Sequence, residues 1–198
     1  MQQAHNSLAN FRAETRKRDF ARSHRFEVQI IPPADLEGDD GKRVPGGQRM
    51  ATHLTSAGRS ANHLSLFVED AMIPGILLGT RPVRINNLNE QRASAIDFGG
   101  DSITFTFLVD VTWAAKDFFG DWMRGIISKR TREIAFPNKY YGGMIVTALN
   151  NKDEVVAKWE LEDVFPRSIA PIQMSNSNTQ PVRLPVTFTY KRWFVIPV

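Results

Sequence analysis

Residues 159–193 read WELEDVFPRSIAPIQMSNSNTQPVRLPVTFTYKRW and contain the two clearest alternating patterns of this 198-residue chain. Trp159 and Leu161 alternate with Glu160 and Glu162, and apolar side chains alternate with mostly polar ones over 182–191. Alternation with a period of two is typical of a β-strand that has one buried and one solvated face. Neither segment holds a nucleophile, a metal-ligand pair or a phosphate-binding loop, so the pattern predicts shape and assembly rather than chemistry.

Further strands are expected on both sides of an inner helical segment. Pro166 is expected to end the strand that contains Trp159, because proline has no amide hydrogen for a β-ladder. The polar residues Asn150–Asp153 favour a hairpin turn. The remaining expected strands cover residues 26–31, 64–70, 77–85, 91–98, 102–110, 144–149 and 154–162.

The segment Trp113–Arg130 is the one convincing helix. Its apolar stripe consists of Phe119, Met123, Ile126 and Ile127, widened by Trp122, at helical spacing. Thr112 is expected to cap the first turn, and the basic Lys129 and Arg130 suit the negative end of the helix dipole. Two glycines weaken the helix, so we expect it to depend on packing against the sheet.

The pattern as a whole predicts a mainly β protein. The expected fold is an antiparallel β-sandwich or barrel with one packed α-helix at about 113–130. Residues 26–198 are expected to form a single domain that includes a long glycine-rich loop at 38–63. The candidate core residues are Phe105, Phe107, Phe119, Trp122, Trp159, Phe165, Phe188 and Trp193.

The net charge of +4 is concentrated in a basic N-terminal arm, residues 1–25. This arm has six Lys or Arg residues and two acidic ones, so it carries the entire net charge of +4. Residues 26–198 are neutral overall. The arm is either a solvated terminus or a contact with an acidic protein surface or nucleic acid. Cysteine is absent, which excludes disulfides and thiolate chemistry and fits a cytosolic origin.

Catalytic and membrane functions find little support in the sequence. No apolar run approaches the roughly 18 to 20 residues of a membrane helix, and the first twenty residues lack the apolar stretch of a secretory signal, so we expect neither. His5, His24, His53 and His63 lie in the arm and the glycine-rich loop, so we expect no metal site and no cofactor. No nucleophile-elbow or phosphate-loop motif occurs, and we expect no enzyme activity.

A single-strand nucleic-acid-binding β-barrel is the alternative from a different functional class. Such proteins stack bases on exposed aromatic side chains that lie among Lys and Arg. Here Phe105, Phe107, Trp159, Phe188 and Tyr190 lie on the apolar phase of their strands, which favours a core face instead. This alternative predicts strongly salt-dependent oligonucleotide binding by the isolated chain.

The order of elements resembles the tail tube protein family of contractile-tailed bacteriophages over about residues 20–194. The resemblance rests on FEVQII, LFVEDAMIPG, ITFTFLVDVTW, FFGDWMRGI, KYYG, WELEDVFPRSI and VTFTYKRW, in that order. It implies a structural virion protein that forms stacked hexameric rings inside a contractile sheath. It also implies a lumen through which the genome passes, and a relationship to the tube of type VI secretion.

The resemblance further implies partners and places. Partners would be sheath, baseplate and tail terminator proteins, with the tape measure protein and DNA in the lumen, and assembly would occur in the host cytoplasm without a membrane. A baseplate tube initiator, or the tube of a phage-derived injection system, is an alternative role. The candidate lumen-facing residues are Thr104, Thr106, Thr187, Thr189, Glu160 and Glu162, and the candidate ring-to-ring contacts are Arg16, Arg18, Arg22, Arg43, Arg49 and Arg59.

The 38–63 loop gives a first testable prediction. Ordering it costs roughly 1 to 2 kcal/mol per residue, which contacts between rings can offset and an isolated subunit cannot. We therefore expect its amides to exchange freely in the monomer and to be protected in the tube. Hydrogen exchange on both states measures this, and equal protection of 38–63 in each would contradict it.

Overall fold

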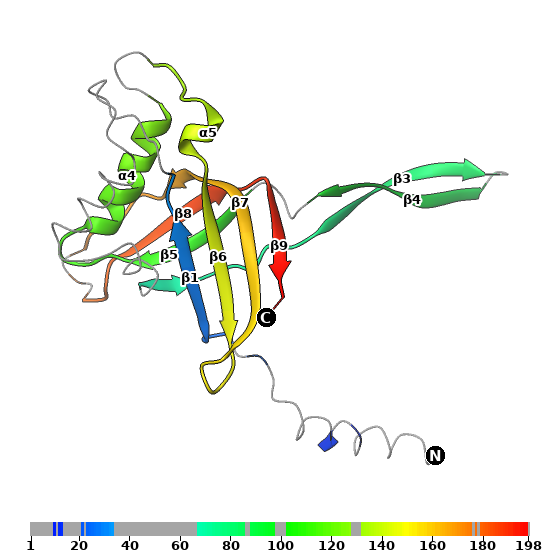
Figure 1. Ribbon diagram of the computed structural model, residues 1–198, viewed down its shortest axis with the longest axis horizontal. Coiled ribbons are helices and arrows are strands. Elements are labelled where there is room, and N and C mark those ends of the chain that lie inside the picture. Colours follow the sequence, from blue (N-terminus) through cyan, green and yellow to red (C-terminus); the bar gives the residue numbers. More distant parts are fainter. Residues whose placement is uncertain are drawn as a thin grey trace.

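The computed structural model describes residues 10, 12–13, 21, 23–33, 67–85, 88–97, 102–127, 132–175, 177 and 179–197. Its described part is mainly β-structure (Figure 1), which confirms the predicted fold class. Seven strands form one curled antiparallel sheet, and two more form a separate hairpin. The strands are β1 (Phe26–Ile31), β2 (Val68–Asp70), β3 (Leu77–Ile85), β4 (Leu88–Asp97), β5 (Ser102–Leu108), β6 (Gly142–Leu149), β7 (Val155–Ile169), β8 (Arg183–Thr189) and β9 (Arg192–Ile196).

The curled sheet has two halves that share β7. The first, here called the β1/β9 half, runs in the order β1, β6, β7, β9, and only the N-terminal part of β7 takes part. The second, the β5/β8 half, contains β2, β5, β8 and the C-terminal part of β7. In Figure 1, β5 and β8 cross the strands of the β1/β9 half. The sheet therefore curls around a space that the apolar side chains fill.

The predicted strand end at Pro166 is wrong. β7 continues to Ile169, and Pro166 lies opposite Phe188 of β8 at a position where the register shifts. From Phe165 onward β7 pairs with β8 alone among the described strands, so a missing amide hydrogen on the other side is tolerated. Asp163, with φ of 54°, marks the bulge at which the strand passes from one half to the other.

The predicted strand over 182–191 corresponds to β8, whereas the strand that follows it, β9, was not predicted. Strand structure is interrupted at Tyr190 and Lys191, and β9 then follows as a strand of its own. Both β8 and β9 run antiparallel to β7 in nearly the same register, from Ile169 opposite Val186 to Lys158 opposite Ile196. Residues 183–196 thus act as one long kinked partner for β7.

Helix α4 (Ala114–Ile126) is shorter than predicted and begins differently. Thr112 is not its cap; Trp113 holds that position with φ of 58° and makes no side-chain capping bond. Asp110 instead accepts hydrogen bonds from the Ala114 amide at 3.3 Å and the Thr112 hydroxyl at 2.6 Å. A carboxylate at this end stabilises the orphan amides and complements the helix dipole.

The buried face of α4 lies nearer its N-terminus than the sequence stripe indicated. Phe118, Phe119 and Trp122 are fully buried, whereas Ile127 is half exposed. Ile127 leaves the helix with extended backbone angles and bridges Ile134, which is why it cannot extend the stripe. Lys129 and Arg130 lie outside the described residues. The short helix α5 (Pro137–Tyr140) was not predicted, and its Tyr140 carbonyl accepts a 2.9 Å hydrogen bond from the Trp122 indole.

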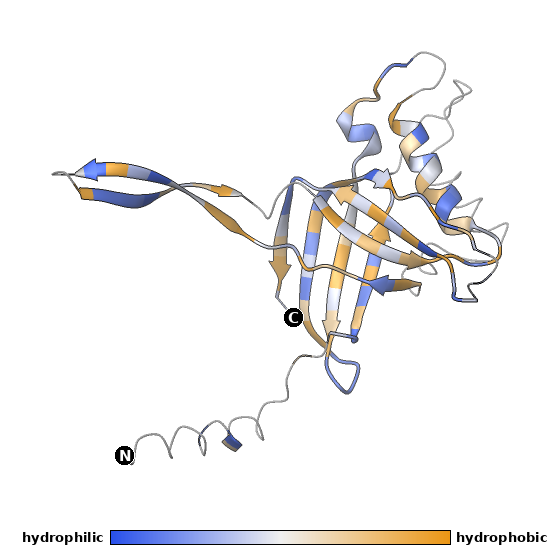
Figure 2. Cartoon of the chain, turned by 180° about the vertical axis from the view of Figure 1, so that it is seen from behind, coloured by the Kyte–Doolittle hydropathy of each residue, from blue (hydrophilic) through white to orange (hydrophobic). Residues whose placement is uncertain are grey.

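One apolar core fills the curled sheet. Phe107 of β5 packs against Phe119 of α4 with ring centroids 4.9 Å apart, and Phe119 packs against Phe188 of β8 at 5.5 Å. Inward residues of both halves, among them Val28 and Val146, belong to the same cluster. Hydropathy along the strands alternates accordingly (Figure 2). No described helix is long and apolar enough to cross a membrane.

A bidentate ion pair fastens the short edge strand β2. The Arg183 guanidinium donates to the Glu69 carboxylate at 2.5 and 2.8 Å, and so reaches across β5 from β8. The hydrogen bond from Arg183 lowers the pKa of Glu69, and Glu69 in turn raises the pKa of Arg183. Next to this pair, the Leu108 amide donates to the Phe67 carbonyl at 2.7 Å.

The close approach at Gly142 gives a stability prediction. An added Cβ there would contact the Ile31 carbonyl oxygen and lie 2.8 Å from the Trp122 ring, neither of which is a flexible chain end. Gly142→Ala is therefore expected to lower the free energy of unfolding by about 1 to 3 kcal/mol. Gly75→Ala is the matched control, because a Cβ at Gly75 meets nothing within 4 Å. Equal denaturation midpoints for the two variants would contradict the packing described.

The Glu69–Arg183 pair predicts a local response to acid. A lowered pKa means that the carboxylate stabilises the docking of β2 fully above the ordinary value of 4.5, and that this contribution is lost as pH falls through the lowered pKa. In an NMR titration, the Leu108 amide should shift in that acidic window in the native chain. It should not do so in Glu69→Gln, whereas Glu160→Gln should retain the shift. A native-like shift in Glu69→Gln would assign the transition to another group.

Candidate assembly interface

The β1/β9 half ends in two strands that have an unpaired edge. Among the described residues β1 pairs only with β6, and β9 pairs only with β7. Each neighbouring pair in this half is antiparallel, so β1 and β9 run in opposite directions. An edge of unpaired amides and carbonyls is a template for pairing with another chain. Placed beside β1 of a second copy, β9 would continue the antiparallel order.

The side chains of β9 do not protect that edge. Natural edge strands are commonly blunted by lysine, proline or inward-pointing charge. Here Phe194 and Val195 point to opposite faces and are 42% and 60% exposed. Arg192 is the single charged residue of the strand, and it pairs with Glu162 at 2.7 Å. The strand therefore presents uncovered apolar surface at a free edge.

The outward face of the β1/β9 half has charges of both signs. Glu160 and Glu162 lie there as predicted from the alternation, half-buried and in the same phase as Lys158 of β7. In adjacent rows, Glu160 lies opposite Phe194, and Lys158 lies opposite Ile196. The mixture leaves no strong field of either sign on this face.

The outward face of the β5/β8 half is uncharged over its centre. The structure brings the four predicted threonines together there, and the Thr104 and Thr187 hydroxyls are 3.0 Å apart and hydrogen-bonded. Ser102 lies opposite Thr189, and Thr106 opposite Pro185. The inward residues of both halves pack into one core, so this hydroxyl face and the Glu160/Glu162 face point away from each other.

The predicted core residues divide into two groups. Phe105, Phe107, Phe119, Trp122 and Phe188 are fully buried. Trp159, Phe165 and Trp193 are half-buried. Phe165 stacks edge-on against Tyr140 at 5.3 Å, where burial raises the pKa of the tyrosine. The Trp193 indole donates a 3.1 Å hydrogen bond to the Gly75 carbonyl, just before β3.

The projection of the β3–β4 hairpin was not predicted. The sequence indicated two strands around Asn86 and Asn87, but not that they would pair only with each other and project from the body (Figure 1). The sequence did contain one signal of this isolation. Each face of the predicted hairpin mixes apolar and charged residues, so neither face can pack into the core. The predicted ring-to-ring arginines, at 16, 18, 22, 43, 49 and 59, and the 38–63 loop lie outside the described residues.

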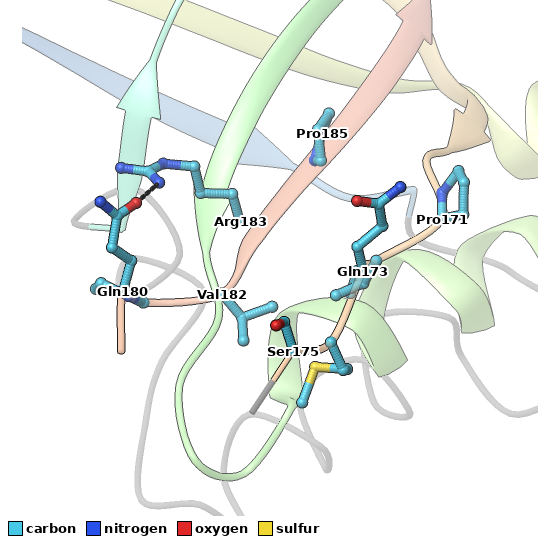
Figure 3. A pocket seen from close by; sticks show the side chains of 10 residues that line it. Pro171, Gln173, Ser175, Gln180, Val182, Arg183 and Pro185 are labelled. Atoms are coloured by element: carbon cyan, nitrogen blue, oxygen red, sulfur yellow. Dashed lines mark hydrogen bonds between the residues drawn. The ribbon is translucent and has the colours of Figure 1, made fainter. Parts of the chain in front are cut away.

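A shallow pocket of about 310 Å³ lies beside β8 (Figure 3). Its rim includes Gln180, which accepts a 3.0 Å hydrogen bond from Arg183. Because Arg183 is already bound by Glu69, the pocket offers no free charge. Within the described ranges, no three His, Asp or Glu side chains cluster to hold a metal ion. The pocket is lined by Pro171, Ile172, Gln173, Met174, Ser175, Gln180, Pro181, Val182, Arg183 and Pro185.

Solved structures share this fold at low sequence identity. A chain of the anti-feeding prophage baseplate, six-fold symmetrised, matches with a TM-score of 0.59 and 13% identity, over 90% of this chain and 97% of that one. The sheath/tube terminator of the extracellular contractile injection system PVC matches with a TM-score of 0.58 and 12% identity, over 91% and 99%. The PVC sheath–tube complex in its extended state matches with a TM-score of 0.55 and 14% identity, over 94% and 97%.

No curated protein matches the sequence. Residues 21–196 match the family described as phage tail tube protein. This matched range spans the whole curled sheet, helices α4 and α5, and the hairpin. The described geometry agrees with a structural role, because its distinctive features are open strand edges and not a reactive cluster. The chain belongs to the phage tail tube protein family and is a structural tail tube subunit.

Proposed function

We propose that copies of this chain join head to tail into a closed ring, with β9 of one copy beside β1 of the next, and that rings stack into a hollow tube. The observation that supports this most directly is the pair of free, oppositely directed edges on the β1/β9 half. A head-to-tail interface repeats around a ring and leaves both ring faces open for stacking. The joined β1/β9 halves would form one continuous barrel without free edges.

Six copies per ring is the proposed number. The baseplate structure that shares this fold is six-fold symmetrised, and the tail tube resemblance implies hexamers. Because each copy adds the same four-stranded half, the diameter of the barrel grows with the copy number for a given strand tilt and stagger. The order of the 38–63 loop, and any contact through the arm of residues 1–25, remain predictions for the stacking of rings.

The outward face of the β1/β9 half is the proposed lumen wall, because its edge strands β1 and β9, with six and five residues, offer longer ladders than the three-residue edge strand β2 of the other half. Glu160 and Glu162 would then line the lumen, and Thr104, Thr106, Thr187 and Thr189 would lie on the side away from it. Neutralised phosphates add affinity for DNA through counterion release, so a basic wall would retain a passing genome. Carboxylates interspersed with Lys158 and Arg192 disfavour such retention.

The proposed partners follow from the same arrangement. A sheath would surround the tube, and a baseplate and a terminator would close its ends; the similar structures belong to a sheath–tube complex, a baseplate and a sheath/tube terminator. The lumen would hold a tape measure protein during assembly and DNA during infection. The finished tube would be part of the virion, after assembly in the host cytoplasm.

Blocking the β9 edge tests this function. Purified native chain at high concentration is expected to form rings or tubes under negative-stain microscopy. Phe194→Lys should shift the protein to monomers, because an edge lysine opposes strand pairing and removes exposed apolar area. Ile134→Lys is the matched control, an exposed apolar residue outside the β1/β9 half, and should assemble normally.

The readouts separate loss of assembly from loss of folding. Sedimentation velocity gives the fraction assembled, and thermal unfolding of the monomer should be the same for both variants, because each position is exposed. A native chain that stays monomeric at every concentration would refute the proposal. Monomers that bind oligonucleotides in a salt-dependent way would instead support the nucleic-acid-binding alternative.

A further inference from the structure

The strands of the β3–β4 hairpin pair with no other described strand. All nine pairings of β3 are with β4, from Leu77 opposite Asp97 to Ile85 opposite Leu88. A two-stranded hairpin alone is marginally stable in water at best. Here the strands are nine and ten residues long, at the upper end of the usual range, although none of their pairings is with the curled sheet.

The hairpin exposes apolar side chains at its base and its tip. Leu78 and Ile96 lie directly opposite each other and are 56% and 62% exposed, and Leu88 at the tip is 73% exposed. Ile76 and Leu77 add to the base and are similarly exposed. Exposed apolar side chains on a projecting element are typical of a surface that another protein covers.

A like-charged cross-strand pair occupies the middle of the hairpin. Arg81 lies directly opposite Arg92 in the register, where like charges destabilise the pairing of strands. Within the described residues Arg92 has one weak, exposed partner in Glu90 at 3.3 Å, and no described carboxylate pairs with Arg81. Among the described residues, Glu90 is thus the single carboxylate that an ion pair links to this arginine pair, and it contacts only Arg92.

The direction of the hairpin indicates where its partner lies. Its base is held beside β9 by the hydrogen bond from Trp193 to the Gly75 carbonyl. From there it extends past the free edge of β9, away from β1, and both views show this (Figures 1 and 2). Whatever pairs with the β9 edge must thus lie within reach of the hairpin.

We propose that the hairpin is a lateral arm that lies across the neighbouring copy bound at the β9 edge. This inference rests on the proposed ring. The neighbour covers the Leu78/Ile96 surface and supplies a carboxylate to the Arg81/Arg92 pair. Each copy presents exposed carboxylates, among them Glu27 on β1 and Asp117 on α4. β9 and the arm together form one side of a two-point interface, and the receiving copy forms the other.

Arg81→Thr separates this role from a merely local one. Removing one arginine relieves the cross-strand repulsion, and threonine favours strands, so amide protection of 77–97 in the monomer should be unchanged or higher. Assembly should nevertheless weaken, with the concentration for half assembly rising about tenfold or more. Arg167→Thr, an exposed strand arginine outside the hairpin, is the matched control and should assemble as the native chain does.

A photo-crosslinker at Ala93, exposed in the middle of the arm, identifies the partner. Assembly from a mixture of light and heavy isotope-labelled copies should give crosslinks between copies, already in single unstacked rings. Crosslinks only within one copy, crosslinks only in stacked tubes, or native-like assembly of Arg81→Thr would each overturn the lateral arm. If the native chain forms rings while Arg81→Thr forms them equally well, the arm is refuted and the proposed ring stands.

Discussion

The pairing of β7 with the kinked segment of β8 and β9 determines the rest of the molecule. β7 is fifteen residues long and belongs to both halves of the sheet, with the change at the bulge around Asp163. Because backbone hydrogen bonds continue along this ribbon on both sides of the bulge, the two halves cannot separate without breaking it. Their inner faces are thereby brought together, and the aromatic core of Phe107, Phe119 and Phe188 follows.

Local patterns in the sequence were sufficient to predict strand faces and fold class. Alternation predicts which side of β8 is buried, since Leu184 and Phe188 point inward and Arg183 and Thr187 outward, as the structure has them. The same reasoning failed at Pro166, because proline is tolerated where only one neighbour pairs. It failed at β9 because RWFVI does not alternate, so no period-two pattern marks that strand. The helix face was misplaced because Ile127 leaves the helix to bridge Ile134, a contact that spacing does not reveal.

The candidate interface was predictable only in its parts. The sequence indicated that Thr104, Thr187 and Glu160 point outward, but their division between opposing faces depends on the bulge in β7, which no periodicity predicts. The isolation of the β3–β4 hairpin was equally hidden, since the absence of a third strand is a non-local property. The basic arm and the glycine-rich loop, which attracted most attention in the sequence, lie largely outside the described residues.

The position of the hairpin beside the β9 edge has a kinetic consequence. On the way to the proposed ring, an open arc of two, three or more copies always leaves one arm uncovered and two strand edges unpaired, one of β9 and one of β1, however long it grows. Closure of the ring covers the last arm and pairs the last strand edges in a single step. Every incomplete arc is therefore less stable per copy than the closed ring. The population should therefore consist of free subunits and complete rings with few intermediates. Partially assembled oligomers with exposed apolar surface and unpaired edges would then stay scarce during assembly.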